Sequence, residues 1–60
     1  MWTIIYIAPS VKIAERIQDR LSDEGFLVKV RPSQHGKQFE ILVPEGELEE
    51  VKEALSSILQ

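Results

Sequence analysis

The sequence contains no cysteine and a single histidine, so two common means of stabilising a small protein are missing. No disulfide can form, and one histidine cannot build a structural zinc site. A chain of 60 residues buries only about 60% of the surface that it exposes when unfolded. We therefore expect good packing, or association with another chain, to supply its stability.

Long apolar runs are also missing. The longest, Trp2–Ala8, follows no basic region and is far shorter than the roughly 20 apolar residues of a membrane-spanning helix. The net charge of −3 argues against a nucleic-acid partner and against binding to an anionic membrane surface. We expect a cytoplasmic protein that binds neither nucleic acid nor membrane.

The rest of the composition is that of an ordinary globular protein, with 43% hydrophobic and 28% charged residues. No internal repeat, low-complexity tract or linker interrupts the sequence. We expect a single domain over residues 1–60.

Two segments near the N-terminus have clear local signals. Trp2–Ala8 is rich in β-branched and aromatic residues, which predicts a strand. Val11–Glu24 is predicted to be a helix, with Ser10 as its N-cap and Gly25 just past its C-terminus. Its apolar positions have helical spacing and are Ile13, Ala14, Ile17 and Leu21.

The second half of the chain predicts a β-hairpin followed by a helix. Apolar residues alternate in Phe26–Arg31 and in Gln38–Val43, with loop residues between these two strands. The final helix is predicted over Glu47–Leu59. The carboxylates at its start favour the positive end of the helix dipole and are Glu45, Glu47, Glu49 and Glu50.

The two strands of the hairpin predict their own register. With Arg31 opposite Gln38, one face is wholly apolar and the other pairs opposite charges, as a stable sheet prefers. The pairs on the charged face are Arg31–Gln38, Lys29–Glu40 and Leu27–Leu42, and those on the apolar face are Val30–Phe39, Val28–Ile41 and Phe26–Val43.

These elements predict an α+β fold of order β-α-β-β-α, a ferredoxin-like half-sandwich. A right-handed crossover from the first strand to the second leaves a gap that the third strand fills. The sheet is then antiparallel with strand order 1-3-2, and both helices cover the face that carries Phe26 and Phe39.

The first strand is apolar on both faces, which leaves large side chains on the face without helices. In one phase Ile4 and Tyr6 lie there, and in the other Ile5 and Ile7 do. Together with Leu27 and Leu42 they would form an apolar patch of the size that usually marks an interaction site. The candidate binding residues are Ile4, Tyr6, Leu27 and Leu42.

Several occupants of this patch are compatible with the sequence. The C-terminal tail or a displaced helix could cover it from within the chain. A second copy could also bury it, and the first strand has no lysine or internal proline to prevent such association. We expect a protein partner or a homodimer, with a small-molecule ligand as a further alternative.

The residues capable of chemistry predict no catalytic site. His35 lies beside Gly36 in a loop without an orienting carboxylate, which favours a solvated turn residue. The acidic segment 45–50 lacks the ligand spacing of a calcium loop. We therefore expect no enzyme activity, no metal site and no cofactor.

Charged rows on the first helix have an equally simple interpretation. Each cation has an acid three residues later, which predicts a solvated face with ion pairs Lys12–Glu15, Arg16–Asp19 and Arg20–Asp23. An RNA-binding sheet is excluded because the third strand would expose Gln38, Glu40 and Leu42 in place of aromatic residues.

The whole-chain pattern resembles a small family of short prokaryotic proteins of unknown function that are labelled signal-transducing. The segments that carry the resemblance are the tryptophan-led strand, Ala14–Ile17, Glu24–Val28 and Glu40–Glu45, followed by an acidic helix. The resemblance implies a ferredoxin-like fold and a regulatory or ligand-sensing role, and it implies no catalytic residue.

We expect a non-enzymatic binding or regulatory module that acts through the open sheet face or the edge of the first strand. The alternative is an accessory protein that acts only by oligomerising or by docking to a larger complex.

Overall fold

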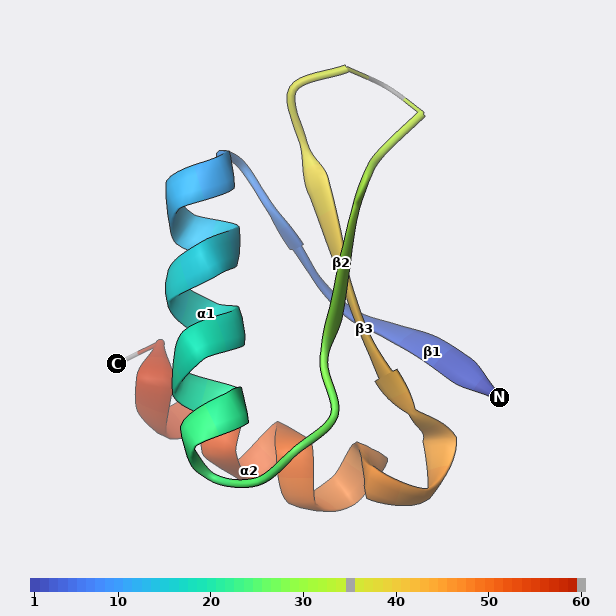
Figure 1. The fold of residues 1–60 in the computed structure, drawn as a ribbon, viewed down its shortest axis with the longest axis vertical. Helices are drawn as coiled ribbons and strands as arrows, with labels where there is room; N and C mark the ends of the chain where they lie inside the picture. Colours follow the sequence, from blue (N-terminus) through green and yellow to red (C-terminus); the bar gives the residue numbers. More distant parts are fainter. Residues whose placement is uncertain (35, 60) are drawn as a thin grey trace.

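A computed structural model describes residues 1–34 and 36–59 and shows a three-stranded sheet with two helices on one face (Figure 1). His35, which the sequence predicts to be a solvated turn residue, lies outside this part of the chain. The elements are β1 (Trp2–Ala8), α1 (Val11–Asp23), β2 (Lys29–Pro32), β3 (Phe39–Pro44), the 3₁₀ turn η1 (Glu45–Glu47) and α2 (Leu48–Ile58).

The strands are antiparallel and have the order β1-β3-β2. The predicted α+β half-sandwich, its strand order and its two helices are therefore confirmed. In the described part of the chain, no helix is of a length and hydropathy that would let it span a membrane.

The ends of α1 are fixed by the residues that the sequence indicated. The Ser10 hydroxyl accepts a hydrogen bond from the Ile13 amide at 3.4 Å, which confirms the predicted N-cap. After the helix, Gly25 adopts a φ of 91°, in the left-handed region that glycine enters without strain. Its amide donates to the Ser22 carbonyl, and the Phe26 amide donates to the Leu21 carbonyl. These two bonds form a Schellman motif, which reverses the chain toward the sheet.

The same motif explains why β2 begins at Lys29 and not at Phe26, as the sequence predicted. The Phe26 amide is already used by the end of the helix, and the Leu27 amide donates to the Glu47 carboxylate at 3.4 Å. Backbone donors that have these partners are not needed in the strand ladder. The predicted strand over Phe26–Arg31 is therefore wrong in its first three residues.

The hairpin register differs from the predicted one by two residues. Arg31 lies opposite Glu40, not opposite Gln38, and Lys29 lies opposite Leu42. An ion pair of 2.6 Å between Arg31 and Glu40 accompanies this register. Because side chains alternate with a period of two, a two-residue shift leaves every residue on its predicted face. The register prediction is wrong, but the division into an apolar and a polar face holds.

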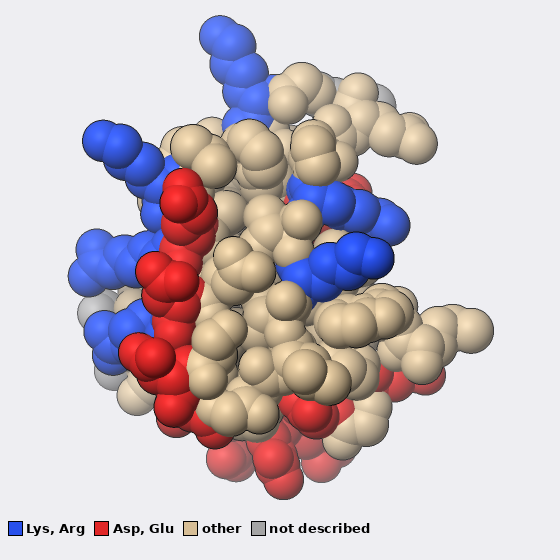
Figure 2. Space-filling model, viewed as in Figure 1, with Lys and Arg blue, Asp and Glu red and all other residues tan. Residues whose placement is uncertain are grey.

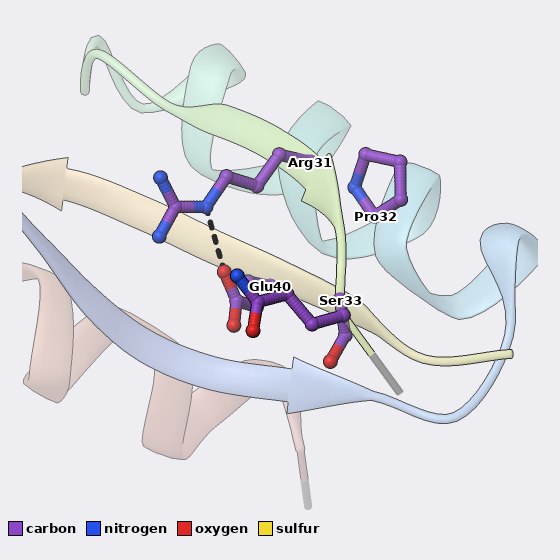
Figure 3. Close-up of a pocket in the computed structure, with 5 residues that line it drawn as sticks. Arg31, Pro32, Ser33 and Glu40 are labelled. Carbon is purple, nitrogen blue, oxygen red and sulfur yellow. Dashed lines mark hydrogen bonds and ion pairs between the residues drawn. The ribbon is translucent and has the colours of Figure 1, made fainter. Parts of the chain in front are cut away.

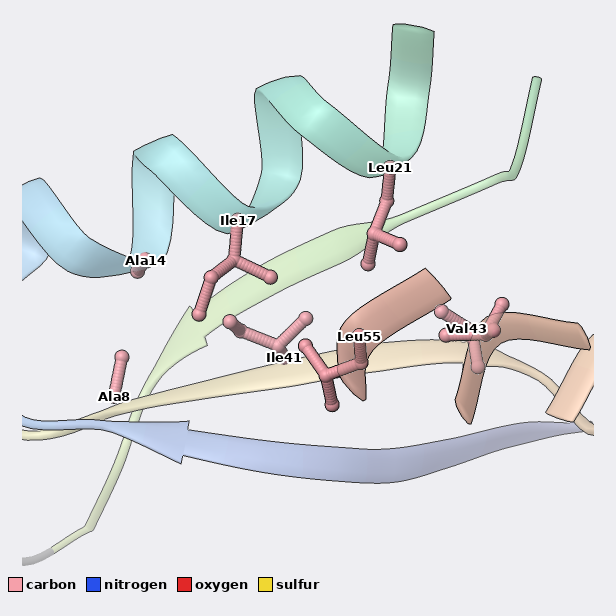
Figure 4. Close-up of a cluster of buried hydrophobic side chains, with 8 residues drawn as sticks. Ala8, Ala14, Ile17, Leu21, Ile41, Val43 and Leu55 are labelled. Atoms are coloured by element: carbon pink, nitrogen blue, oxygen red, sulfur yellow. The ribbon is translucent and has the colours of Figure 1, made fainter. Parts of the chain in front are cut away.

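The core lies between the helices and β3 (Figure 4). Ile41 and Val43 of β3 point toward the helices and are fully buried. The other members of the buried cluster are Ala8, Ala14, Ile17, Leu21, Val51 and Leu55. Phe26 and Phe39 pack against this cluster, on the face where the sequence placed them.

A β-bulge changes the phase of β1. Ile4 pairs with Leu42 and Tyr6 pairs with Ile41, so Ile5 is an extra residue that pairs with no residue of β3. Both Ile5 and Tyr6 pack against the core. Neither of the two predicted phases is correct, because each assumed strict alternation along the strand.

Candidate binding surface on the open sheet face

The face of the sheet opposite the helices has an apolar side and a basic side. We call it the open face and define it by the residues whose pairing and alternation place them there, which are Trp2, Ile4 and Ile7 of β1, Glu40 and Leu42 of β3, and Lys29 and Arg31 of β2. The β1 edge contributes only uncharged side chains, whereas the β2 edge contributes two cations. The two edges of one face thus differ in chemistry.

Three large apolar side chains of β1 lie partly in solvent on the open face. The relative exposures of Trp2, Ile4 and Ile7 are 44%, 44% and 49%. Both helices pack on the other face, so they do not cover these residues. Contiguous exposed apolar side chains with a polar rim are typical of interaction sites.

Leu42 belongs to the same face but is only 4% exposed. It lies between Ile4 on one neighbouring strand and Lys29 on the other. The Lys29 ammonium group also lies 5.8 Å from the centroid of the Trp2 ring. Because Lys29 and Trp2 belong to strands on either side of β3, their contact crosses β3 next to Leu42. Side chains from both edges therefore cover the central strand.

The structure does not bring the predicted binding residues Ile4, Tyr6, Leu27 and Leu42 together as one exposed patch. Ile4 is exposed on the open face, and Leu42 lies there under cover. The bulge turns Tyr6 toward the core. Leu27 is 61% exposed but lies before β2, outside the sheet.

Ile7 and Lys29 lie on this surface but are not among the predicted binding residues, although one predicted phase of β1 places Ile7 on the open face. Ile7 joins Ile4 on the open face only because Ile5 is the extra residue of the bulge. A strand with isoleucine at both Ile4 and Ile5 gives no signal of where its phase changes. The alternating pattern around Lys29 places this residue on the open face. It does not predict the contact between Lys29 and Trp2.

A polar hollow lies where the hairpin loop joins the open face (Figure 3). It is lined by Arg31, Pro32, Ser33, Gln34 and Glu40. The Arg31 Nε donates to Glu40 Oε1 at 2.6 Å across this hollow. Since the carboxylate neutralises the guanidinium, the hollow has no net charge with which to attract an anion.

The charged rows of α1 lie side by side on its solvent-exposed surface, as Figure 2 shows for the acidic and basic side chains along this helix. The predicted ion pairs Lys12–Glu15, Arg16–Asp19 and Arg20–Asp23 are not formed. Across residues 1–34 and 36–59, the one ion pair within 4.0 Å joins Arg31 and Glu40. Water solvates exposed charges well, so pairing them gains little free energy.

The described part of the chain contains no buried polar or charged side chain. Within it, no group of three or more histidine, aspartate or glutamate residues is arranged to hold a metal ion. The chemistry that the open face offers is therefore apolar contact on its β1 side and cationic contact on its β2 side.

Comparisons of the chain with protein-family models, with curated proteins and with solved structures find no match.

Proposed function

We propose that this chain is a non-enzymatic binding module that recognises a protein partner through the open face. The observation that carries the proposal is the exposure of Trp2, Ile4 and Ile7 side by side on a face that neither helix covers. Burying such side chains gains about 25 cal/mol for each Å² of apolar surface removed from water. A partner that covers them would gain binding free energy from each of the three.

A protein fits this surface better than a small molecule does. Small-molecule sites are usually concave and lined mostly by apolar side chains. The hollow at the hairpin loop is lined mainly by polar and charged residues, and a second hollow on α1 is lined by charged residues alone. Neither includes Trp2, Ile4 or Ile7. The apolar part of the open face is an exposed strand surface, which suits an extended or helical segment of another chain.

The charge of the open face indicates the chemistry of the partner. The chain has a net charge of −3, yet the open face carries Lys29 and Arg31 against the single carboxylate of Glu40. Complementary charges steer partners together and select the correct one. The favoured partner is therefore a segment with apolar side chains for the β1 side and a carboxylate for Lys29.

We further propose that the module is non-enzymatic, regulatory and cytoplasmic. Catalytic groups usually have pKa values shifted by burial or by close charged neighbours. The described residues include no buried titratable side chain, which supports a binding role. The resemblance to proteins labelled signal-transducing supports a regulatory role, and we place the protein in the cytoplasm.

Selection from a displayed library of random peptides tests this function, because such a library offers apolar and acidic segments in many combinations. We expect the protein to enrich peptides that combine apolar residues with a carboxylate. Lys29→Glu should weaken their binding by about tenfold, because it places a like charge opposite the carboxylate. The matched control Lys12→Glu reverses a charge on α1 and should leave binding unchanged. Enrichment of no peptide, or equal losses in the two variants, would contradict the proposal.

A second candidate function is association of the chain with itself. The uncharged edge of β1 favours it, and that edge leads to a specific arrangement of two copies.

A further inference from the structure

The two edges of the sheet are protected to different degrees. β2 forms one edge and is only four residues long, with Lys29 and Arg31 exposed and Pro32 unable to donate a backbone hydrogen bond. Short length, charge and proline are the features by which proteins prevent their sheet edges from pairing with other chains. The β2 edge is thus unsuited to pairing.

β1 forms the other edge and has none of these features. It is seven residues long, has the sequence WTIIYIA, and contains neither a charged residue nor proline. In the described part of the chain, β1 pairs only with β3, so its far edge has no partner strand. Because β1 carries no charge, a second β1 strand meets no electrostatic repulsion from it.

Because of the bulge, residues 3–8 of β1 alternate between the two faces of the sheet in an order that reads the same in both directions. Ile4 and Ile7 lie on the open face, and the two residues between them, Ile5 and Tyr6, pack toward the core. The flanking Thr3 and Ala8 pair with residues of β3 that also face the helices. If 'in' means the face toward the helices and 'out' means the open face, the pattern from residue 3 to residue 8 is therefore in, out, in, in, out, in. It is symmetrical about the bond between Ile5 and Tyr6.

We propose that β1 pairs antiparallel with β1 of a second copy around a two-fold axis at this bond, so that two sheets join into one of six strands. Ile4 then lies opposite the partner's Ile7, and Ile5 lies opposite the partner's Tyr6. Each pair consists of residues on the same face. A strand with strict alternation would place such pairs on opposite faces, so the bulge is what permits this register.

Charge favours pairing at the edge over a dimer formed face to face. If two open faces packed together around a two-fold axis, Glu40 would stay paired with Arg31 of its own copy, and Lys29 would meet either the cations of the other copy or its apolar β1 side. The first arrangement brings like charges together, and the second removes a charge from water without a partner. Edge pairing leaves Lys29 and Arg31 in solvent at the outer edges of the six-stranded sheet. It also joins the two open faces into one surface.

This inference goes beyond the proposed function, because it concerns the edge of β1 and not the partner of the open face. Its first test is the mass of the purified protein by sedimentation equilibrium across a wide range of concentration. We expect a species of twice 6.9 kDa, the mass of the chain. Isotope-filtered NOEs should then connect Ile4 to the partner's Ile7. A mass of 6.9 kDa at every concentration, or a dimer whose NOEs lie elsewhere, overturns the inference.

Two matched double variants test the register. Ile4→Lys with Ile7→Lys places like charges opposite each other in both symmetrical pairs and should give a monomer. Ile4→Lys with Ile7→Glu changes the same two positions but places opposite charges together, so it should remain a dimer. Both positions are close to half exposed, so the fold should tolerate these changes, and far-ultraviolet circular dichroism checks it. Folded variants with the same oligomeric state overturn the register.

The outcomes for this inference and for the proposed function are separable. A monomeric protein that binds the selected peptides overturns edge pairing alone. A dimer with the expected NOEs that enriches no peptide supports edge pairing and overturns the proposed function alone.

Discussion

The Lys29 ammonium group lies 5.8 Å from the centroid of the Trp2 ring, although these residues belong to the strands at opposite edges of the sheet. Their contact crosses β3 beside Leu42, which explains how Leu42 is 4% exposed on a face that no helix covers. Lysine can cover apolar surface with its methylene chain while its charge stays in water. The open face is thus partly closed by its own edge strands.

Substitution of Lys29 should separate the contribution of its charge from that of its methylene chain. Lys29→Met removes the charge but keeps an apolar chain over Leu42, and it should cost less than about 1 kcal/mol, as expected for an exposed cation–π contact. Lys29→Ala also uncovers Leu42 and should cost more. Urea unfolding measures both, with fluorescence of Trp2, the single tryptophan, as the signal. Equal losses in the two variants would show that the methylene chain does not protect Leu42.

Two leucines from the predicted binding set should differ sharply in their contribution to stability. Leu42→Ala removes a side chain that is 4% exposed and should lower the free energy of unfolding by about 2–5 kcal/mol. Leu27→Ala is the control, since Leu27 is 61% exposed and its loss should change stability by less than about 0.5 kcal/mol. Urea unfolding curves give both values. Similar losses would contradict the different burial of the two side chains.

Much of the fold could be predicted because its signals are local or follow from alternation. Ser10 and Gly25 mark the ends of α1 by their own conformational preferences, and both have the predicted roles. Strand order follows from the crossover and the hairpin, and the buried face follows from the alternation of Ile41 and Val43 around Leu42. These features hold even though strand boundaries shift by a few residues.

Register and the exposed site could be predicted less well, for two physical reasons. A shift of two residues leaves the face pattern unchanged, so alternation cannot distinguish Arg31 opposite Gln38 from Arg31 opposite Glu40. The bulge at Ile5 has no sequence signal, because its neighbours are also large and apolar. The bulge determines which side chains of β1 reach the open face. The candidate site was therefore predicted only in part.

A double-mutant cycle should confirm the observed register through the coupling between Arg31 and Glu40. The side chain of Arg31 is 54% exposed, so the pair should contribute only about 0.2–1 kcal/mol. The cycle uses Arg31→Gln, Glu40→Gln and the double variant, with unfolding free energies from urea denaturation. High salt should reduce the coupling. The control cycle of Lys29 with Glu40 should give a coupling near zero, and a larger coupling there would favour the register in which Lys29 lies opposite Glu40.

Gly25 and Gly46 form a matched pair that tests how the chain turns from α1 toward β2. An added Cβ would meet no atom within 4 Å at either position, so the two differ in backbone conformation and not in available space. Gly25 has a φ of 91°, and Gly25→Ala should destabilise the protein by about 1–2 kcal/mol, the cost of the left-handed region for a residue with a Cβ. Gly46 is not in that region, so Gly46→Ala should be neutral or stabilise by up to about 1 kcal/mol through its effect on the unfolded chain. Thermal unfolding gives the sign of the stability change in each variant.

Hydrogen exchange should also show faster exchange of the Phe26 amide in Gly25→Ala only, because that amide donates to the Leu21 carbonyl in the Schellman motif. Unchanged protection of the Phe26 amide, together with unchanged stability, would show that the left-handed glycine is not what ends α1.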